Sequence, residues 1–235
     1  MKTLGMILGM SYESSIHYYV EINKQVNAKL GNLNCARMNC YNVNFEDYRE
    51  LMQAGEWDKI GHELAKIAKM LEQDGVDCVA IATNTMHKVA DYVQSQINVP
   101  LIHIADCVAR KCKEYQIYDV GLLGTSYTMT EDFLKERLRK NGLTVYTPED
   151  EETINRIDYI IFNQLCKGII DRDSKEYLEW IIRCMRQEKG IKGVILGCTE
   201  LGMLIKPSYT CVPAIFDTTI AHIDSLVEFS IDKNS

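Results

Sequence analysis

Parts of this sequence occur twice, in the same order, and this duplication limits the folds that the chain can adopt. Residues 5–12 (GMILGMSY) and 120–127 (VGLLGTSY) share the pattern Leu-Gly-x-Ser-Tyr. Two further pairs of similar segments follow. Residues 78–85 (CVAIATNT) match 193–200 (GVILGCTE), with the same separation along the chain as in the first pair. Residues 100–106 (PLIHIAD) match 213–217 (PAIFD), with a slightly different separation. One matching pentapeptide can arise by chance, but three ordered matches indicate two copies of one structural unit.

Short apolar runs alternate with amphipathic segments along the chain. In 57–74, apolar residues recur every three or four positions and Gly75 follows, which predicts a helix and its end. Similar patterns predict helices over about 174–188 and 218–231. The apolar runs predict buried strands at residues 3–8, 36–43, 76–82, 100–104, 119–123, 143–146, 191–197 and 212–216. Because strands that alternate with helices form parallel sheets, we expect an α/β fold of two pseudo-symmetric half-domains, each a parallel sheet flanked by helices.

The predicted elements also place the boundary between the two halves. No stretch rich in Pro, Gly or Ser separates the two copies, so we expect them to pack closely. The boundary is expected near Asn98-Val99-Pro100, which gives an N-terminal half of residues 1–99 and a C-terminal half of 100–217. The final helix, within 218–235, is expected to fold back onto the N-terminal half, because 100–217 is already complete as a unit.

Composition excludes several classes of protein. The 235 residues carry a formal net charge of −7, whereas a nucleic-acid-binding surface needs excess positive charge. No apolar stretch reaches the roughly 18 residues of a membrane-spanning helix, and the first residues lead into a strand pattern instead of a signal peptide. We therefore expect a cytoplasmic protein whose partner is neither nucleic acid nor membrane. The nine cysteines include no CxxC pair, which argues against a metal site and against a disulfide framework.

The duplicated segments mark strand ends, and ligands bind at the carboxyl ends of strands in open parallel α/β sheets. Four such ends are predicted, at 9–11, 83–85, 124–126 and 198–200. If the two halves face each other, these loops meet in one active-site cleft, with Thr83 and Cys198 as counterparts on opposite walls. A helix that begins directly after a strand offers free N–H groups and a positive dipole end. We expect these to favour a bound carboxylate and a thiolate at Cys198.

Three segments carry a resemblance to a known family. Residues 8–14 (LGMSYES), 83–88 (TNTMHK) and 197–200 (GCTE) resemble signature segments of the aspartate/glutamate racemases. The linking segments are similar as well, so the resemblance covers nearly the whole chain and points to the broad-specificity branch. It implies a homodimer of two-domain chains that uses neither pyridoxal phosphate nor a metal. It also implies that one cysteine removes the α-proton of an amino acid, while a second cysteine on the opposite face delivers a proton.

The chain departs from this family pattern at one catalytic position. Thr83 stands where the family has its first cysteine, and Cys198 matches the second. A threonine hydroxyl does not ionise usefully near neutral pH, so Thr83 is expected to donate or relay a proton and to be a poor base. By analogy with the family, Cys198 abstracts the α-proton of the L-enantiomer, and Lys167 resembles the lysine that holds the distal carboxylate. The expected substrate-binding residues are Met10, Ser11, Asn84, Thr85, Thr125, Lys167, Thr199 and Glu200.

Five further residues are weaker candidates for the site. Four of them have two open interpretations each, and the fifth is expected to have an ordinary structural role. His87 either tunes the site around Thr83 or packs within a helix. His103 and Asp106 lie at a predicted strand end, where they serve the site or bond to the loop backbone. Arg49 either holds a carboxylate or is a solvated helix residue, and His222 is expected to be an ordinary helix residue.

The residues and the resemblance together predict an amino-acid racemase that acts on aspartate, glutamate or both. Two alternatives stay open. The first is a single-cysteine decarboxylase or isomerase of the same superfamily, and the second is a dicarboxylate-binding protein with little turnover. A Rossmann dinucleotide site is weakly supported, because Gly5-x-x-x-Gly9 lacks the GxGxxG spacing.

Overall fold

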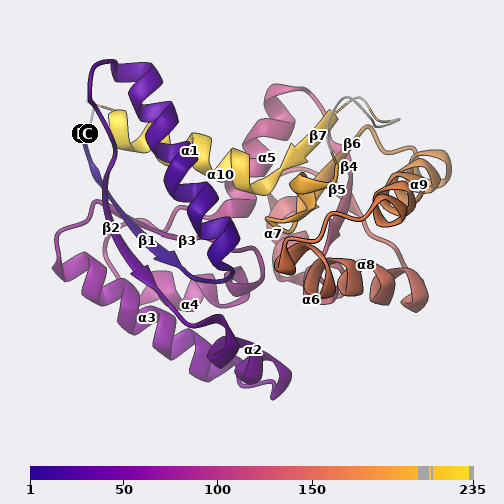
Figure 1. Cartoon of the computed structure of the whole chain (residues 1–235), viewed down its shortest axis with the longest axis horizontal. Coiled ribbons are helices and arrows are strands. Elements are labelled where there is room, and N and C mark those ends of the chain that lie inside the picture. Colours follow the sequence, from indigo (N-terminus) through magenta and orange to yellow (C-terminus); the bar gives the residue numbers. More distant parts are fainter. Residues whose placement is uncertain (206–211, 213, 233–235) are drawn as a thin grey trace. The chain divides into compact units, whose positions relative to one another are not determined.

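The computed structural model describes residues 1–205, 212 and 214–232 (Figure 1). Its contacts divide the chain into two units, one made of Met1–His103 with His222–Ser235 and the other of Ile104–Ala221. The boundaries expected after residues 99 and 217 lie four residues before these divisions. Cys211 and Pro213, the first residue of the last repeated segment, lie outside the described residues. Within the described part, no helix is both long enough and apolar enough to cross a membrane.

The first unit contains a parallel sheet in the order β2-β1-β3. The strands are β1 (Thr3–Leu8), β2 (Arg37–Asn42) and β3 (Cys78–Ile81). All three lie within the predicted runs, and β1 and β3 are nearly continuously apolar because helices cover both faces of these strands. β2 is an edge strand and much of it is exposed, which agrees with its more polar sequence.

The strand predicted over 100–104 is wrong as a full strand. The structure has an isolated parallel bridge there, between Val79 and Leu101. Val79 donates its N–H to the Pro100 carbonyl (2.9 Å) and accepts from the Ile102 N–H (2.9 Å). The chain then enters α5 (Ile104–Glu114), so the apolar run is divided between one pairing site and the first turn of a helix.

Helices cover both faces of the first sheet. The buried residues of α1 (Tyr12–Leu30) and α10 (Thr218–Ile231) form one core with alternate residues of β1 and β3. The predicted helix over 57–74 is confirmed as α3 (Trp57–Gln73), which contacts β1 and β3. The remaining helices of this unit are α2 (Phe45–Gln53), the 3-10 helix η1 (Thr85–Val89) and α4 (Ala90–Ser95).

The second unit repeats this topology in a sheet of order β5-β4-β6-β7. Its strands are β4 (Asp119–Gly124), β5 (Thr144–Tyr146), β6 (Gly193–Gly197) and β7 (Ala214–Asp217), all parallel. β4 takes the place that β1 has in the first sheet, and β6 takes that of β3. The pairing of Val194 with Ile215 corresponds to the bridge between Val79 and Leu101. The duplication in the sequence is therefore a duplication of sheet topology.

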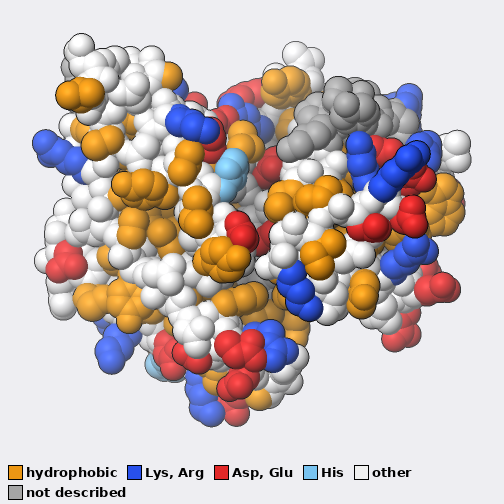
Figure 2. All heavy atoms as spheres, in the orientation of Figure 1, with side chains coloured by type: hydrophobic (Ala, Val, Ile, Leu, Met, Phe, Trp, Pro, Cys, Tyr) orange, Lys and Arg blue, Asp and Glu red, His pale blue; other side chains and the backbone are white. Residues whose placement is uncertain are grey.

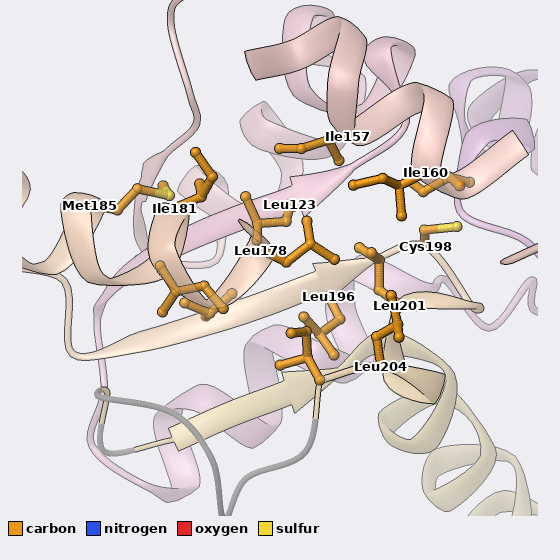
Figure 3. Packing of buried hydrophobic residues seen from close by; sticks show 14 of the residues in the cluster. Leu123, Ile157, Ile160, Leu178, Ile181, Met185, Leu196, Cys198, Leu201 and Leu204 are labelled. Atoms are coloured by element: carbon orange, nitrogen blue, oxygen red, sulfur yellow. The ribbon is translucent and has the colours of Figure 1, made fainter. Parts of the chain in front are cut away.

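One apolar cluster joins this sheet to two long helices (Figure 3). The helices are α8 (Glu151–Asn163) and α9 (Arg172–Lys189), and the strands are β4 and β6. Cys198, just after β6, belongs to the same cluster, so the strand end with the candidate nucleophile is held by the core. The other helices that lie within this unit are α5, α6 (Ser126–Thr130), α7 (Asp132–Lys140), η2 (Leu165–Lys167) and η3 (Leu201–Met203).

The outer face of α1 is unusually apolar for an exposed surface. Tyr12, Ile16, Tyr19 and Val20 are between 38% and 62% exposed. Their spacing places them on one side of the helix. Figure 2 shows hydrophobic side chains gathered over this helix.

Candidate functional site

The loop after β3 contains Thr83, partly exposed, with buried residues around it. The Thr83 N–H bonds to the Ile81 carbonyl (2.9 Å), and the chain then enters η1. His87, 3% exposed, places its Nδ1 2.7 Å from the Thr83 carbonyl oxygen. Because a carbonyl oxygen only accepts, His87 donates from Nδ1 and fixes the backbone of Thr83. Asn84 and Thr85, both expected to bind substrate, are buried in this loop.

His87 belongs to a buried cluster of aromatic and imidazole rings in the first unit. Its ring centroid lies 4.4 Å from that of His103 and 6.1 Å from that of His222. The Tyr18 hydroxyl lies 2.9 Å from His222 Nδ1, and His222 Nε2 lies 2.8 Å from the Ile102 carbonyl oxygen. Burial lowers the pKa of His222 to about 4, so this ring is neutral at neutral pH. We define these four rings (Tyr18, His87, His103, His222) as the histidine cluster.

The loop after β1 is organised by hydroxyl groups. Ser11 caps α1, because its Oγ accepts the Ser14 N–H (3.4 Å). Ser15 Oγ accepts from the Gly9 N–H (2.8 Å) and donates to the Ser11 carbonyl (2.6 Å). Met10 is 4% exposed, and the Met10–Ser11 peptide is cis. Ser11 therefore has a clear structural role beside the binding role predicted for it.

The loop after β6 brings three predicted residues into one hydrogen-bonded group. Cys198 Sγ donates to Glu200 Oε2 at 3.0 Å, and Thr199 Oγ1 donates to the same oxygen at 2.6 Å. Glu200 is 4% exposed and Cys198 is 7% exposed, so both groups are shielded from water. The carboxylate is thus held directly against the thiol by the chain itself.

The thiolate expected at Cys198 is not favoured by this environment. Burial, the charge of Glu200 and the nearby Cys166 raise the pKa of the Cys198 thiol well above its usual value. The helix expected directly after the strand is only the three-residue η3, which begins at Leu201. A single 3-10 turn has only a small aligned dipole. This dipole does not offset the effects of burial and of the negative charge of Glu200, both of which disfavour the thiolate. Cys198 is therefore a protonated thiol whose proton faces a carboxylate.

Two further predicted residues lie in the second unit. Lys167 ends η2 and is exposed, with its Nζ 3.3 Å from Asn163 Oδ1. It follows Cys166, which packs against the core cluster that contains Cys198, and burial raises the pKa of Cys166 to about 12. Thr125 is 5% exposed and caps α6 through its Oγ1, which accepts the Thr128 N–H. Lys167 is thus an exposed neighbour in sequence of a residue that packs on this cluster, whereas Thr125 has a capping role.

The remaining candidates have structural partners. Asp106 accepts from Arg137 Nε (2.9 Å) and Nη2 (2.7 Å) and from Asn141 Nδ2 (2.9 Å), so it has side-chain partners within its own unit. Arg49 Nε donates to Glu46 Oε2 at 2.8 Å on the same helix. The partnership of Tyr18 with His222 is not predictable from the sequence, since no local pattern connects α1 with α10.

The structure thus combines a duplicated parallel α/β unit with a thiol–carboxylate pair at one strand end. The family model of Asp/Glu/Hydantoin racemases matches residues 7–226. The chain belongs to this family.

Solved structures agree with this assignment. A Yersinia pestis protein, provisionally assigned as an Asp/Glu racemase, is 39% identical with a TM-score of 0.92, over 99% of this chain and 100% of that one. PH1733 from Pyrococcus horikoshii OT3, described as an aspartate racemase homologue, is 36% identical with a TM-score of 0.86, over the same shares. A glutamate racemase from Hydrogenobaculum sp. (strain Y04AAS1) is 24% identical over 169 residues, which are 68% of this chain and 62% of that enzyme. The chain thus spans less than two thirds of that enzyme, and the descriptions of all three relatives refer to racemases.

Proposed function

We propose that this protein is an amino-acid racemase that acts on aspartate, glutamate or both without pyridoxal phosphate. The observation that carries the proposal is the contact between Cys198 Sγ and Glu200 Oε2 at 3.0 Å, at a strand end of a racemase fold. Cys198 exchanges a proton with the α-carbon of the L-enantiomer. Thr83 donates or relays a proton to the opposite face.

The chemistry at Cys198 requires that its thiol lose a proton before it can act as a base. Because the pKa of this thiol is raised, a free thiolate is a minor species, and a nearby acceptor is needed. Glu200 takes the thiol proton, and the sulfur electron pair then takes the α-proton. The electrons of the broken C–H bond remain on the α-carbon and spread into the substrate carboxyl group. Glu200 thus acts as the base that activates the thiol.

Thr83 completes the inversion as a donor. Its hydroxyl delivers a proton to the carbanion and regains one from water, so that no alkoxide accumulates. Glu200 then gives up the proton that it took from the thiol and neutralises the hydroxide that remains, so every group returns to its starting state. Thr83 is a poor base for the reverse path, and abstraction from D-substrates is expected to be slow. The two enantiomers have equal free energy, so the ratio of kcat/KM for the two directions is one, and any apparent one-way behaviour reflects different KM values or incomplete exchange.

The substrate class follows from the donors near each strand end. Asn84, Thr85 and Thr199 offer donors for the α-carboxylate, and the Lys167 ammonium offers a partner for a distal carboxylate. Met10, Ser11 and Thr125 complete the proposed binding residues. Dicarboxylic amino acids fit this set better than apolar ones, which would leave the lysine without a role.

We also propose a cytoplasmic homodimer. The apolar face of α1, formed by Tyr12, Ile16, Tyr19 and Val20, supports self-association, because exposed apolar patches commonly mark interfaces. Sedimentation of the wild type and of an Ile16→Glu variant measures this directly. A monomeric wild type would contradict the dimer and leave the chemistry unaffected.

The function is tested by exchange of the α-hydrogen in D₂O with L- and D-aspartate and L- and D-glutamate. We expect deuterium uptake from L-substrates in the wild type and a loss of at least about 100-fold in Cys198→Ser, since the thiol is the proposed base. Thr83→Cys should raise activity on D-substrates. Cys184→Ser, a half-buried cysteine on α9, is the matched control and should exchange normally.

Three outcomes would contradict the proposal. The absence of both deuterium uptake and D-product would remove aspartate and glutamate as substrates. Binding of a dicarboxylate without exchange would identify a binding protein. Release of CO₂ from a substituted malonate would identify a single-cysteine decarboxylase.

A further inference from the structure

A cavity of about 360 Å³ lies in the first unit, at the carboxyl end of the edge strand β2. Its walls come from the end of β2, the following loop, α2 and α3. None of the residues proposed for the racemase reaction lines it. Its volume falls within the roughly 300–1,000 Å³ of small-molecule sites. The cavity is thus large enough for a small metabolite and separate from the residues of the proposed reaction.

The wall nearest the sheet is apolar and held in place by the backbone. Val43 and Ile67 are 7% and 8% exposed. The Val43 N–H donates to the Leu8 carbonyl at 2.9 Å. Gly9 has φ +101°, and a Cβ there would lie 2.2 Å from the Val43 oxygen, so only glycine permits this close approach. This wall is preformed and does not need a ligand to order it.

Charged groups of both signs line the same cavity. Lys66 on α3 forms no ion pair with any described residue, and its ammonium is available to an anion. Glu63, three residues earlier on α3, and Asp47 on α2 present carboxylates. Asp47 already accepts a hydrogen bond from Asn44 Nδ2 at 2.8 Å. The lining therefore offers separate positions for a positive and a negative group of one ligand.

Two tyrosines add flat surfaces and hydroxyl groups. Tyr48 is 4% exposed, and burial together with the charge of Glu63 raises its pKa, so it remains a neutral phenol. Tyr41 is 39% exposed, and with Met70, 40% exposed, it adds apolar surface to the lining. Aromatic faces also attract ammonium groups. An ammonium near Glu63 would thus meet both a carboxylate and an aromatic ring.

We propose that this cavity binds a free α-amino acid with an apolar side chain. The carboxylate pairs with Lys66, the ammonium pairs with Glu63, and the side chain packs on Val43 and Ile67. A purely anionic ligand would face two carboxylates, and a purely cationic one would face the lysine. A neutral apolar ligand would remove water from the charges of Lys66, Glu63 and Asp47 without pairing them, which is energetically unfavourable. A zwitterionic ligand can pair each of its two charges with a group of opposite charge.

The test is calorimetric titration of the full chain with L-leucine, L-methionine and L-phenylalanine. The analogues L-leucinamide, which lacks the carboxylate, and N-acetyl-L-leucine, which lacks the ammonium, report on each charge separately. Lys66→Met and Glu63→Gln change exposed residues and should fold normally, as circular dichroism can verify. Lys69→Met is the matched control, since Lys69 lies on α3 but does not line the cavity and contacts Gln96 at 3.1 Å.

We expect at least one amino acid to bind, with affinity at least about tenfold weaker in Lys66→Met, in Glu63→Gln and for both analogues, because a charged hydrogen-bonding partner is lost. Lys69→Met should bind as the wild type does. The proposal is overturned if no amino acid binds up to about 10 mM, or if the two lining variants or the analogues bind equally well. Because binding and not α-hydrogen exchange is measured, failure here is distinguishable from failure of the proposed racemase activity.

Discussion

His222 makes the stability of this protein depend on pH in a way that one substitution should remove. The ring is fully buried on α10 and bonded at both nitrogens. The Ile102 carbonyl only accepts, so Nε2 carries the hydrogen, and the neutral ring receives the Tyr18 hydroxyl proton at Nδ1. A proton added at Nδ1 would create a buried charge and displace this bond. Burial accordingly lowers the pKa of His222 from 6.5 to about 4.

The sign and size of the effect follow from linkage. Above pH 6.5 His222 is neutral in the folded and unfolded chains, and its contribution to stability is fully present. As the pH falls from 6.5 toward 4, the unfolded chain binds a proton that the folded chain does not, so the free energy of unfolding decreases. A difference of about 2.5 pKa units corresponds to about 3 kcal/mol at the acid end of this range.

The substitution His222→Gln isolates this contribution. Its amide N–H can donate to the Ile102 carbonyl, and its amide oxygen can accept from Tyr18, but the side chain does not titrate. The free energy of unfolding is measured by urea titration, followed by circular dichroism, at about pH 7 and about pH 4.5. Its decrease between these two pH values should be about 2.5 kcal/mol smaller in this variant than in the wild type. His17→Gln, at an exposed position on α1, is the control. Equal losses in wild type and His222→Gln would refute the reasoning.

Three other predictions follow from single contacts. Glu200→Gln removes a charge that raises the pKa of Cys198, so this thiol should react faster with iodoacetamide at neutral pH, as measured by mass spectrometry of the labelled peptide; an unchanged rate would show that burial alone protects it. Tyr18→Phe leaves a buried ring nitrogen without its donor and should lower the free energy of unfolding by roughly 1–3 kcal/mol in urea titrations, whereas a neutral result would argue for an alternative donor. Gly9→Ala places a Cβ 2.2 Å from the Val43 oxygen at φ +101° and should destabilise the chain by more than about 1 kcal/mol, and a wild-type melting temperature would contradict this.

Most strands of the two sheets were predictable from sequence, because parallel strands that are buried on both faces have continuous apolar sequences. Both sheets place the first strand of their copy between two others, as the duplication implies. The segment 100–104 failed because an apolar run of this length fits one bridge plus a helix start as well as a strand. Only the hydrogen bonds of Pro100 and Ile102 to Val79 distinguish the two.

The environment of the candidate site was less predictable, because it depends on contacts between distant residues. The pattern of α1 indicates that Tyr18 is buried, but not that it meets His222, which is 204 positions away. Likewise, sequence places Cys198 after a strand and Glu200 two residues later, but not the direction of either side chain. Burial of the thiol, together with the carboxylate that faces it, raises the pKa of Cys198 and reverses the expectation of a stabilised thiolate.

The duplicated backbone presents the same strand end twice, and the side chains at equivalent positions differ in what they can do with a proton. Where the second unit has Cys198 followed by Thr199 and Glu200, the first has Thr83 followed by Asn84 and Thr85. One copy therefore combines a thiol with a carboxylate that accepts its proton, and the other copy has hydroxyl groups at both of these positions. Thr83→Cys restores the thiol but not its acceptor, so exchange of the α-hydrogen of D-substrates in D₂O should become faster while remaining slower than that of L-substrates. The asymmetry of the proposed reaction lies in the pair of residues at each strand end and not in the cysteine alone.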